Sequence, residues 1–183
     1  MEELSLHILD IVENSIAAEA DRIEIAVLED KKKDLLSVEI IDNGKGLDPD
    51  QIKRAIDPFY TTKTTRRFGL GLSLLSEAAK AANGKFSIDS RVGEGTNVKA
   101  EFQHSHIDRQ PMGDIAQTLI TLILGNPGID FIYTHKRNGH KYHLSTRKIK
   151  NQLKSELLNS PEGIKRLRED LNQINKKLTG GKK

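Results

Sequence analysis

The first 42 residues switch from a helical to an extended pattern of apolar side chains. Apolar residues recur every three or four positions, at Leu4, Ile8, Ile11, Val12 and Ile16, and predict an amphipathic helix over residues 2–20. Residues 22–29 alternate between apolar and polar, and residues 35–41 are apolar and β-branched, and both patterns predict strands. A polar turn separates them, so we expect a β-hairpin over residues 22–42.

Helices and strands continue to alternate as far as residue 104. Pro49 behind the capping residue Asp48 predicts a short helix over residues 49–56. Residues 57–67 lack periodicity and are rich in hydroxyl and basic side chains, which predicts a loop. A helix over residues 72–82 ends at Asn83-Gly84, and strands follow over residues 85–90 and 96–102.

The composition shifts near residue 105, after which we expect a helix, a hairpin and a final helix. The helix covers residues 111–124, and strands 131–136 and 140–145 flank Asn138-Gly139, a strong signal for a two-residue turn. The final helix begins at Pro161, and its apolar stripe consists of Ile164, Leu167, Leu171, Ile174 and Leu178. This spacing favours either a short coiled-coil face in a homodimer or a helix packed on its own domain.

Composition narrows the class of protein. The chain has 183 residues, of which 36% are hydrophobic and 30% charged, enough for one full domain with an appendage. It contains no cysteine, which excludes disulfides and thiolate metal sites. No apolar run reaches membrane-spanning length and no signal peptide is visible, so we expect no membrane partner and a cytoplasmic location.

Charge is unevenly distributed along the chain, although the net formal charge is only +3. Residues 1–104 carry 14 Lys and Arg against 19 Asp and Glu, and residues 105–135 carry 1 against 3. Residues 136–183 carry 14 against 4, a local charge of +10. Such a tail permits contact with nucleic acid or an acidic partner, but is more often a solvated helix face. We therefore rank nucleic acid below a protein partner bound through residues 105–183.

A glycine-rich segment, Asp42-Asn43-Gly44-Lys45-Gly46, directly follows the second strand. On its own this segment is ordinary turn chemistry. Its glycines would also let a ligand approach the backbone closely, and the Asp42 carboxylate can accept a hydrogen bond from an exocyclic amine. Two more clusters, Gly69–Gly71 and Gly93–Gly95, follow along the chain, and this ordered set favours a binding site over a plain turn.

Groups suited to a cation and to an anion accompany these glycines. Asp10 and Asn14 are four residues apart and share a helix face, where a carboxylate and a carboxamide suit Mg²⁺. Gly69-Leu70-Gly71 at a helix start directs free backbone N–H groups toward an anion. The basic residues just upstream, Lys63, Arg66 and Arg67, can reach phosphate oxygens.

With these residues in place, the sequence resembles the GHKL ATP-binding superfamily over about residues 2–103. That superfamily includes histidine kinases, the ATPase part of DNA gyrase, the MutL mismatch-repair proteins and Hsp90. Five segments resemble its boxes in order: Leu9–Ser15 the N-box, Asp42–Gly46 the G1 box, Pro58–Lys63 the F-box of histidine kinases, Phe68–Leu72 the G2 box and Gly93–Thr96 the G3 box. The resemblance implies ATP and Mg²⁺ as cofactors. It also implies an α/β two-layer sandwich of a mixed sheet and helices, the Bergerat-type ATP-binding fold, here with a small C-terminal extension.

The resemblance also implies roles for individual residues. Asn14 would bind Mg²⁺, Asp42 would accept a hydrogen bond from the adenine amine, and Thr96 would lie near the adenine. The expected nucleotide-binding set is Asn14, Asp42, Gly44, Gly46, Lys63, Arg66, Arg67, Gly69, Leu70, Gly71, Leu72 and Thr96. Residues 1–104 would form the ATP-binding domain, residues 105–150 a helix plus β-hairpin extension, and residues 151–183 a basic C-terminal helical tail.

Three positions depart from the patterns of this superfamily. Kinases often carry an extra Gly two residues before Gly69, where this chain has Arg67, so the expected lid is short and basic. Hydrolysing branches carry a water-activating Glu four residues before the metal-binding Asn. Here that position is Asp10, one methylene shorter, so Asp10 can be a general base only if it reaches the proton. Ala17 replaces a Lys that is frequent in kinase N-boxes.

Two histidines are candidates for the phosphate-accepting residue of a kinase. The chain begins at the first helix of the ATP-binding domain, so we expect no phosphoacceptor domain before it. His7 lies on that helix and is more simply a surface or packed histidine. Ser105–Met112 resembles the histidine-kinase H-box, with Arg three and Pro five residues after His106, although its acidic residue is displaced by one place. His106 is therefore a candidate phosphoacceptor, and a plain linker leading into a helix is the alternative.

Histidines are also frequent in the second half of the chain. They are His104, His106, His135, His140 and His143. Because matched carboxylate or thiolate partners are missing from the sequence pattern, we expect surface positions on the hairpin rather than a metal site.

Three functions are consistent with the sequence. The Phe-Tyr-Thr-Thr-Lys loop and the short lid favour an ATP-dependent kinase that transfers the γ-phosphate to a histidine, its own or a partner's, in signalling. The small size favours a stand-alone serine kinase and partner-binding switch resembling anti-sigma factors. The Glu-Asn-Ser-Ile sequence of the first helix favours an ATP-gated dimerising clamp resembling MutL or gyrase. Histidine kinase is the first prediction of the three.

Overall fold

A computed structural model of the chain describes residues 3–56, 70–153 and 158–178. In chain order the elements are α1 (Leu4–Ala17), β1 (Arg22–Asp30), β2 (Leu35–Asp42), α2 (Pro49–Ile56), α3 (Gly71–Ala81), β3 (Lys85–Arg91), β4 (Gly95–Gln103), α4 (Ile115–Gly125), β5 (Asp130–Arg137), β6 (His140–Ser145), α5 (Thr146–Gln152) and α6 (Pro161–Leu178). Within these described ranges, every helix is too short or too polar to cross a bilayer.

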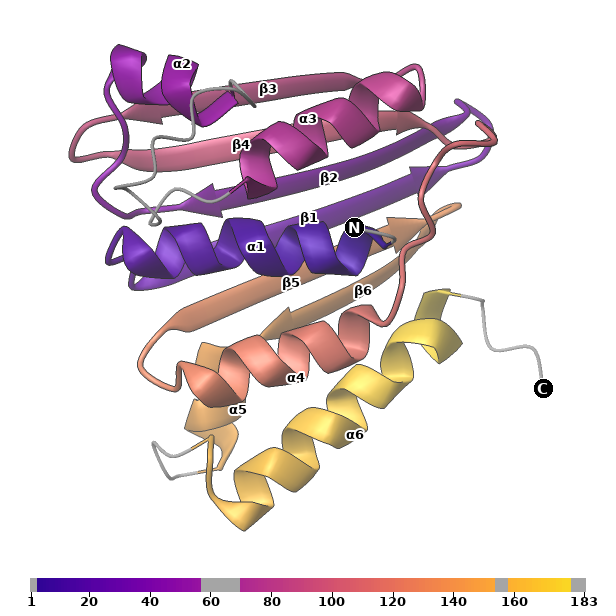
Figure 1. The fold of residues 1–183 in the computed structure, drawn as a ribbon. Coiled ribbons are helices and arrows are strands. Elements are labelled where there is room, and N and C mark those ends of the chain that lie inside the picture. Colours follow the sequence, from indigo (N-terminus) through magenta and orange to yellow (C-terminus); the bar gives the residue numbers. More distant parts are fainter. Residues whose placement is uncertain (1–2, 57–69, 154–157, 179–183) are drawn as a thin grey trace.

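The strands form one six-stranded sheet in the order β3-β4-β2-β1-β5-β6 (Figure 1). Neighbouring strands are antiparallel except for β1 and β5, which are parallel. The chain crosses from β4 to β5 through α4, so the second hairpin joins the sheet on the far side of β1. The basic second half of the chain therefore extends the sheet that begins with β1 and β2.

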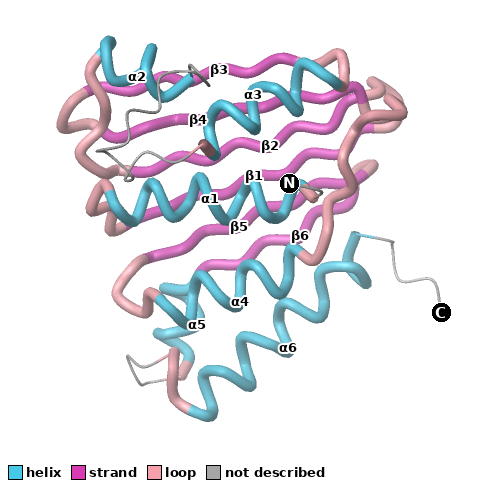
Figure 2. The backbone as a smooth tube through the Cα atoms, in the orientation of Figure 1, coloured by secondary structure: helices cyan, strands magenta, loops and turns pink. Residues whose placement is uncertain are grey.

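Helices α3, α1, α4 and α6 pack next to one another across one face of this sheet (Figures 1 and 2). The strand pattern explains why they do so. On β1, Ile23, Ile25 and Val27 are at most 2% exposed, whereas the residues between them are only partly covered. The predicted α/β sandwich of a mixed sheet and helices is confirmed.

The first helix ends at Ala17, three residues earlier than expected. Glu19 has a positive φ of 61°, and the N–H of Ala20 donates to the carbonyl of Ser15 at 3.1 Å. This contact closes the helix in the manner of a C-terminal capping motif. The chain then turns directly into β1, which apolar periodicity alone does not reveal.

The helix expected over residues 111–124 begins at Ile115 instead. The carbonyl groups of Pro111 and Met112 accept the first backbone N–H groups of α1, each at 2.9 Å. That pairing holds the segment outside a helix, and Asp114 then caps α4 by accepting an N–H of its first turn at 2.9 Å.

The structure contains one further helix, α5, that the sequence pattern does not predict. Thr146 and Ile149 of this helix are buried. The apolar stripe of α6 packs within the chain, in contact with α4, β6 and α5. Its buried members are Leu167, Leu171, Ile174 and Leu178, each at most 2% exposed. Of the two roles expected for this stripe, the structure therefore has the helix packed on its own domain.

A buried polar network joins β1 to β5 beneath the helices. Glu29 is 5% exposed and accepts hydrogen bonds from Nε2 of His135 at 2.8 Å and from Nε of Arg137 at 3.0 Å. The Tyr133 hydroxyl contacts the other ring nitrogen of His135 at 2.9 Å. The expected surface position of His135 is wrong, because this side chain is 3% exposed. The alternation shared with Phe131 and Tyr133 places it on the inner face.

The Glu29 carboxylate predicts a specific pH dependence of stability. Burial raises its pKa, but the hydrogen bond from His135 and the charge of Arg137 outweigh burial and lower the pKa from 4.5 to about 2. Stability from the ionised carboxylate is therefore complete above pH 4.5 and lost as the pH falls toward 2. Between pH 6 and pH 3 this group should account for a loss of about 2 kcal/mol in the free energy of unfolding.

Urea unfolding of Glu29→Gln at these two pH values measures that loss. The substituted protein should lack this component, so its free energy of unfolding should change less with pH than that of the parent. Glu24→Gln, on the outer face of the same strand, is the matched control and should retain the parent's pH dependence. Equal pH dependence in Glu29→Gln and the parent would contradict the assignment.

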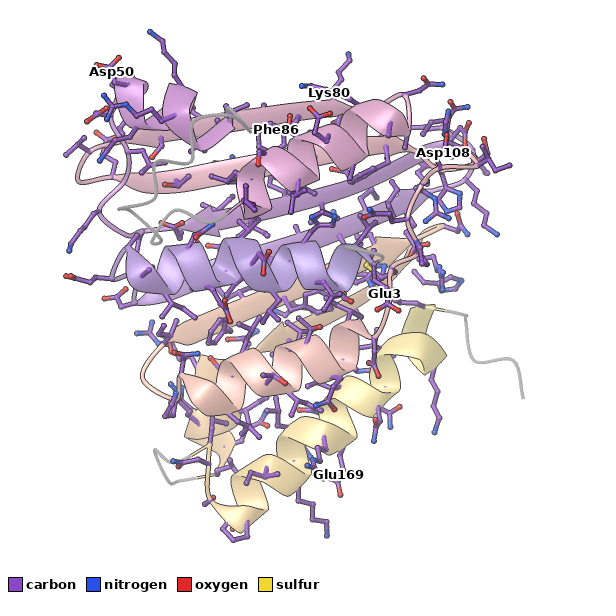
Figure 3. All side chains as sticks on the ribbon, viewed as in Figure 1. Glu3, Asp50, Lys80, Phe86, Asp108 and Glu169 are labelled. Atoms are coloured by element: carbon purple, nitrogen blue, oxygen red, sulfur yellow. The ribbon has the colours of Figure 1, made fainter. Side chains whose placement is uncertain are left out.

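Leu171 tests the packing of α6. It is 1% exposed, so Leu171→Ala should lower the free energy of unfolding by about 2–5 kcal/mol through lost burial and a residual cavity. Glu169→Ala, at the exposed position labelled in Figure 3, should change it by less than about 0.5 kcal/mol. Denaturant unfolding measures both values. A change in oligomeric state with unchanged monomer stability would instead indicate a coiled-coil interface.

Candidate functional site

A cavity of about 480 Å³ lies where β2 ends and β4 begins. Its walls come from α1, the loop after β2, α2, the first turn of α3, the turn before β4, and β4. The lining residues are Ile11, Asn14, Ser15, Ala17, Ala18, Asp42, Lys45, Gly46, Leu47, Asp48, Gln51, Leu72, Val92, Thr96 and Val98. The volume and the mixture of apolar walls with a few polar groups are typical of a small-molecule site.

Asp42 is the buried charged residue of this lining, at 8% exposed. Its Oδ2 accepts the Ser15 hydroxyl at 2.6 Å, and its Oδ1 accepts the backbone N–H of Gly44 at 2.9 Å. These two bonds orient the carboxylate and leave each oxygen able to accept a further hydrogen bond. Thr96 is the direct cross-strand neighbour of Asp42. The two residues expected near a base therefore lie side by side.

The glycines after Asp42 allow two close backbone approaches. A Cβ at Gly44 would lie 2.7 Å from the carbonyl oxygen of Ala18, so any larger residue would push the loop away from α1. Gly46 has a φ of +67°, and a Cβ there would overlap the carbonyl of Arg91. Both positions require glycine for the shape of the cavity wall.

Asn14 and Asp10 share a face of α1, as expected, but have different surroundings. Asn14 lines the cavity. Asp10 packs against the start of α3, where a Cβ at Gly71 would lie 2.9 Å from the Asp10 Cβ. Leu70, the residue before α3, provides no side-chain cap to the first N–H groups of this helix, and a helix start of this kind favours an anionic group.

The described members of the expected nucleotide-binding set converge on this cavity. Asn14, Asp42, Gly46, Leu72 and Thr96 line it, and Gly44 lies against the lining residue Ala18. Gly71 directly precedes the lining residue Leu72 and packs against Asp10. Leu70 is 51% exposed beside the start of α3. Lys63, Arg66, Arg67 and Gly69 lie outside the described residues, as does the segment resembling the F-box.

Two serines support the site without having been singled out from the sequence. Ser15 holds Asp42, and its place on the buried stripe of α1 is a signal that helical spacing could have supplied. Ser90 accepts the backbone N–H of Leu47 at 2.8 Å and contacts the Thr96 hydroxyl at 2.9 Å. The contact with Leu47 spans 43 residues of sequence, so no local pattern marks Ser90.

His106 lies beyond the other end of β4. Its N–H donates to the carbonyl of Gln103 at 3.1 Å, and the strand rises about 24 Å from Thr96 to Gln103. In Figure 3, Asp50 on α2 lies near the left end of the strands and Asp108, near His106, lies near their right end. The Thr96 end of the cavity is therefore remote from His106 in the same chain.

The other candidate, His7, is packed inside the protein. It is 1% exposed, and its Nε2 contacts the side-chain oxygen of Gln110 at 2.8 Å. Burial lowers the pKa of His7, against the opposing effect of that hydrogen bond. This is the packed position that we expected as the simpler alternative.

Comparison with known proteins identifies relatives of the first half of the chain. The family described as "Histidine kinase-, DNA gyrase B-, and HSP90-like ATPase" matches residues 2–106. The sensor histidine kinase YxdK of Bacillus subtilis is 37% identical over 106 residues, which are 54% of this chain and 32% of that protein. The sensor protein kinase FleS of Pseudomonas aeruginosa is 39% identical over 89 residues, or 49% of this chain and 22% of that protein. The chain thus spans a third or less of the length of these relatives.

Similarity of fold extends further along the chain. The MutL ATPase domain of Aquifex aeolicus, solved with ADP, superposes on this chain with a TM-score of 0.52 at 17% identity. The superposition covers 94% of this chain and 70% of the MutL domain. The N-terminal domain of a DNA repair protein superposes with a TM-score of 0.54 at 22% identity, over 82% of this chain and 56% of the repair protein's chain. At these identities the likeness shows the fold alone.

The family match covers more than half of the chain, and five sequence boxes occur in the order of that family. The chain therefore belongs to the histidine kinase-, DNA gyrase B- and HSP90-like ATPases, the GHKL superfamily.

Proposed function

We propose that this chain binds Mg-ATP in the cavity at Asp42 and serves as the ATP-dependent part of a histidine kinase in signalling. The observation that carries the proposal is the convergence of Asn14, Asp42, Leu72 and Thr96 on one cavity from four separate elements. One relative named a sensor histidine kinase and another named a sensor protein kinase support the reaction class.

The adenine would occupy the part of the cavity between Asp42 and the apolar walls. Both Asp42 oxygens retain acceptor capacity after bonding Ser15 and Gly44, which suits an exocyclic amine. The side chains of Ile11, Leu72 and Val98 supply apolar surface for a planar base. Val92 is 71% exposed at the cavity, and a bound base would cover part of this apolar side chain.

The phosphates would extend toward Asn14 and the start of α3. Mg-ATP supplies the γ-phosphoryl group, and its cation neutralises charge on the phosphates. A single carboxamide from Asn14 fits Mg²⁺, which usually keeps several water ligands and binds few protein groups. The first N–H groups of α3 would hold phosphate oxygens. Asp10 beside Gly71 would be the general base nearest to that end.

The phosphate-accepting histidine would belong to another polypeptide chain. His106 of the same chain lies beyond the far end of β4, about 24 Å along the strand from the cavity residue Thr96. His106 of a second copy, or a histidine of a protein partner, can approach the phosphate end without this constraint. The parts of the chain outside the cavity, including residues 105–183, would then provide surface for the partner.

A substitution at Asp42 tests nucleotide binding. Asp42→Asn replaces one acceptor oxygen by an amide donor, so ATP affinity should fall by about tenfold to a hundredfold, as for a lost hydrogen bond to a charged group. Calorimetric titration with ATP, with and without Mg²⁺, measures the change. Asp89→Asn on the exposed face of β3 removes the same charge outside the cavity and should bind ATP like the parent. An unchanged ATP affinity in Asp42→Asn would contradict the assignment of this cavity as the nucleotide site.

The structural likeness supports a second candidate, an ATP-gated dimerising clamp. The family match ends at residue 106, whereas the fold likeness to the MutL ATPase domain covers 94% of the chain. The second half of this chain therefore has a structural counterpart there, which the kinase proposal does not use. This is an argument from fold, and the fate of the phosphate distinguishes the two candidates.

The fate of the γ-phosphate tests the reaction. With γ-labelled ATP, the kinase proposal expects acid-labile protein-bound label and little free phosphate. Asp10→Glu restores the longer acid of the hydrolysing branches, so phosphate release should increase by at least about tenfold while ATP affinity stays unchanged. Asp10→Asn is the matched control and should not increase it.

Comparison with His106→Gln locates the acceptor, since acid-labile label that persists in this variant excludes His106. If the protein releases free phosphate and forms ATP-dependent dimers but carries no acid-labile label, the function is that of the ATP-gated clamp and not of a histidine kinase. Acid-stable label on a partner would indicate a serine kinase instead.

A further inference from the structure

Two turns that are far apart in the sequence meet at the end of the sheet remote from the cavity. The side-chain oxygen of Asn138, in the β5–β6 turn, accepts the backbone N–H of Lys31, in the β1–β2 turn, at 3.1 Å. The N–H of Asn138 donates in return to the carbonyl of Glu29 at 3.0 Å. These bonds bring the three consecutive exposed residues Lys31–Lys33 next to the hairpin of the basic second half.

Lys136 and Lys141 stand directly opposite each other in the register of β5 and β6. Both are exposed, and they lie on the face away from the helices because their neighbours His135 and Tyr142 are buried on the inner face. Opposed Cβ atoms in such a pair are about 5 Å apart, and like charges at that spacing destabilise a sheet. This pair of like charges does not stabilise the fold, which indicates that the two lysines have a role in binding.

Lys148 continues the same positive surface beyond β6. His143 lies on the outer face with Lys141, where it contacts the Thr134 hydroxyl at 3.1 Å. Burial lowers the pKa of His143, and the nearby charges of Lys148 and Lys141 lower it further. We call the resulting surface the lysine edge. It consists of Lys31, Lys32, Lys33, Lys136, Lys141 and Lys148.

The charges of the lysine edge are not compensated by ion pairs. Its six lysines make no salt bridge with any residue in the described ranges. The carboxylates on the adjoining turn and strand are engaged with other groups: Asp30 with the backbone N–H groups of Lys32 and Lys33, Asp34 with Gln103 and Ser105, and Asp130 with Arg147 and Lys150.

We propose that the lysine edge binds the phosphate backbone of double-stranded DNA without reading its sequence. Lysine presents a compact point charge that suits phosphate, whereas base reading usually relies on the bidentate fork of arginine. Opposed and clustered lysines match a partner whose own charges are closely and regularly spaced. The proposal does not depend on the reaction proposed for the ATP cavity.

The side chains that surround the lysine edge argue against other anionic partners. The large apolar side chains exposed in the described part of the chain are Leu6, Ile41, Leu70, Leu74, Val92 and Ile107, and none belongs to this edge. Ile107 is near the edge, because its loop bonds through Ser105 to Asp34 beside Lys33. A single isoleucine does not make the cluster of apolar anchors that protein interfaces and membrane-surface helices use. The edge also lacks exposed aromatic rings, on which the bases of single strands would stack.

The dimensions of the lysine edge set the expected salt dependence. β6, which separates the turn lysines from Lys148, has six residues and a length of about 20 Å. That length covers about six base pairs of duplex, enough for roughly four to six phosphate contacts. The logarithm of the binding constant should therefore fall with the logarithm of salt concentration with a slope of about −4 to −5.

Fluorescence anisotropy with a labelled 20-base-pair duplex of mixed sequence tests the proposal, using the full chain without nucleotide over a series of KCl concentrations. The doubly substituted Lys136→Ala/Lys141→Ala should bind at least about tenfold more weakly at low salt and should reduce the slope by about 2. Lys80→Ala/Lys85→Ala removes the same charge from exposed positions on α3 and β3 and should bind like the parent. Circular dichroism and ATP titration confirm that both variants remain folded.

Four outcomes would overturn the proposal. The first is the absence of duplex binding by the parent at 25 mM KCl. The second is equal weakening in the two double variants, which would mean that only total charge matters. The third is tighter binding to the single strand of the same sequence. The fourth is tighter binding to vesicles with anionic lipids or to polyglutamate than to the duplex.

Discussion

The hydrogen bond from Ser15 to Asp42 is the contact on which the arrangement of the ATP-binding half depends. A carboxylate at 8% exposure is unfavourable unless its oxygens are bonded, and here a helix hydroxyl and a loop N–H supply the bonds. The same two bonds tie the C-terminal part of α1 and the glycine loop to the end of β2. The cavity is thus a consequence of satisfying one buried charge, and its polar group is oriented before any ligand arrives.

The parallel pairing of β5 with β1 has the corresponding role for the second half of the chain. It places a hairpin of the basic segment on the sheet of the acidic segment, and it brings His135 and Arg137 to Glu29. Removing one partner from such a network leaves a buried group unbonded, so the network specifies the register of β5 as well as stabilising it. The β5–β6 turn then lies beside the β1–β2 turn, which creates the lysine edge.

The sequence predicts those features that depend on local spacing. Periodicity locates the long helices and the strands, and the ordered boxes single out Asn14, Asp42, Gly46 and Thr96, which the fold brings to one cavity. Features set by long-range pairing are missed. The start of α4 depends on carbonyls given to α1, the partner of Ser15 is 27 residues away, and that of His135 is 106 residues away. The position of His135 is a local feature, because its alternation with Phe131 and Tyr133 places it on the inner face whatever the usual preference of histidine for the surface.

The cavity and the turn lysines of the lysine edge lie at opposite ends of the same strands. The length of β2, about 24 Å, separates Asp42 from Leu35 next to the lysine-bearing turn. This exceeds the screening length of about 8–10 Å at physiological salt, so nucleotide and duplex charges would scarcely repel each other. Any influence of one ligand on the other must therefore pass through the structure. The direct mechanical route is β1 and β2, because their hydrogen-bonded register reaches from the cavity loop to the lysine turn without a break.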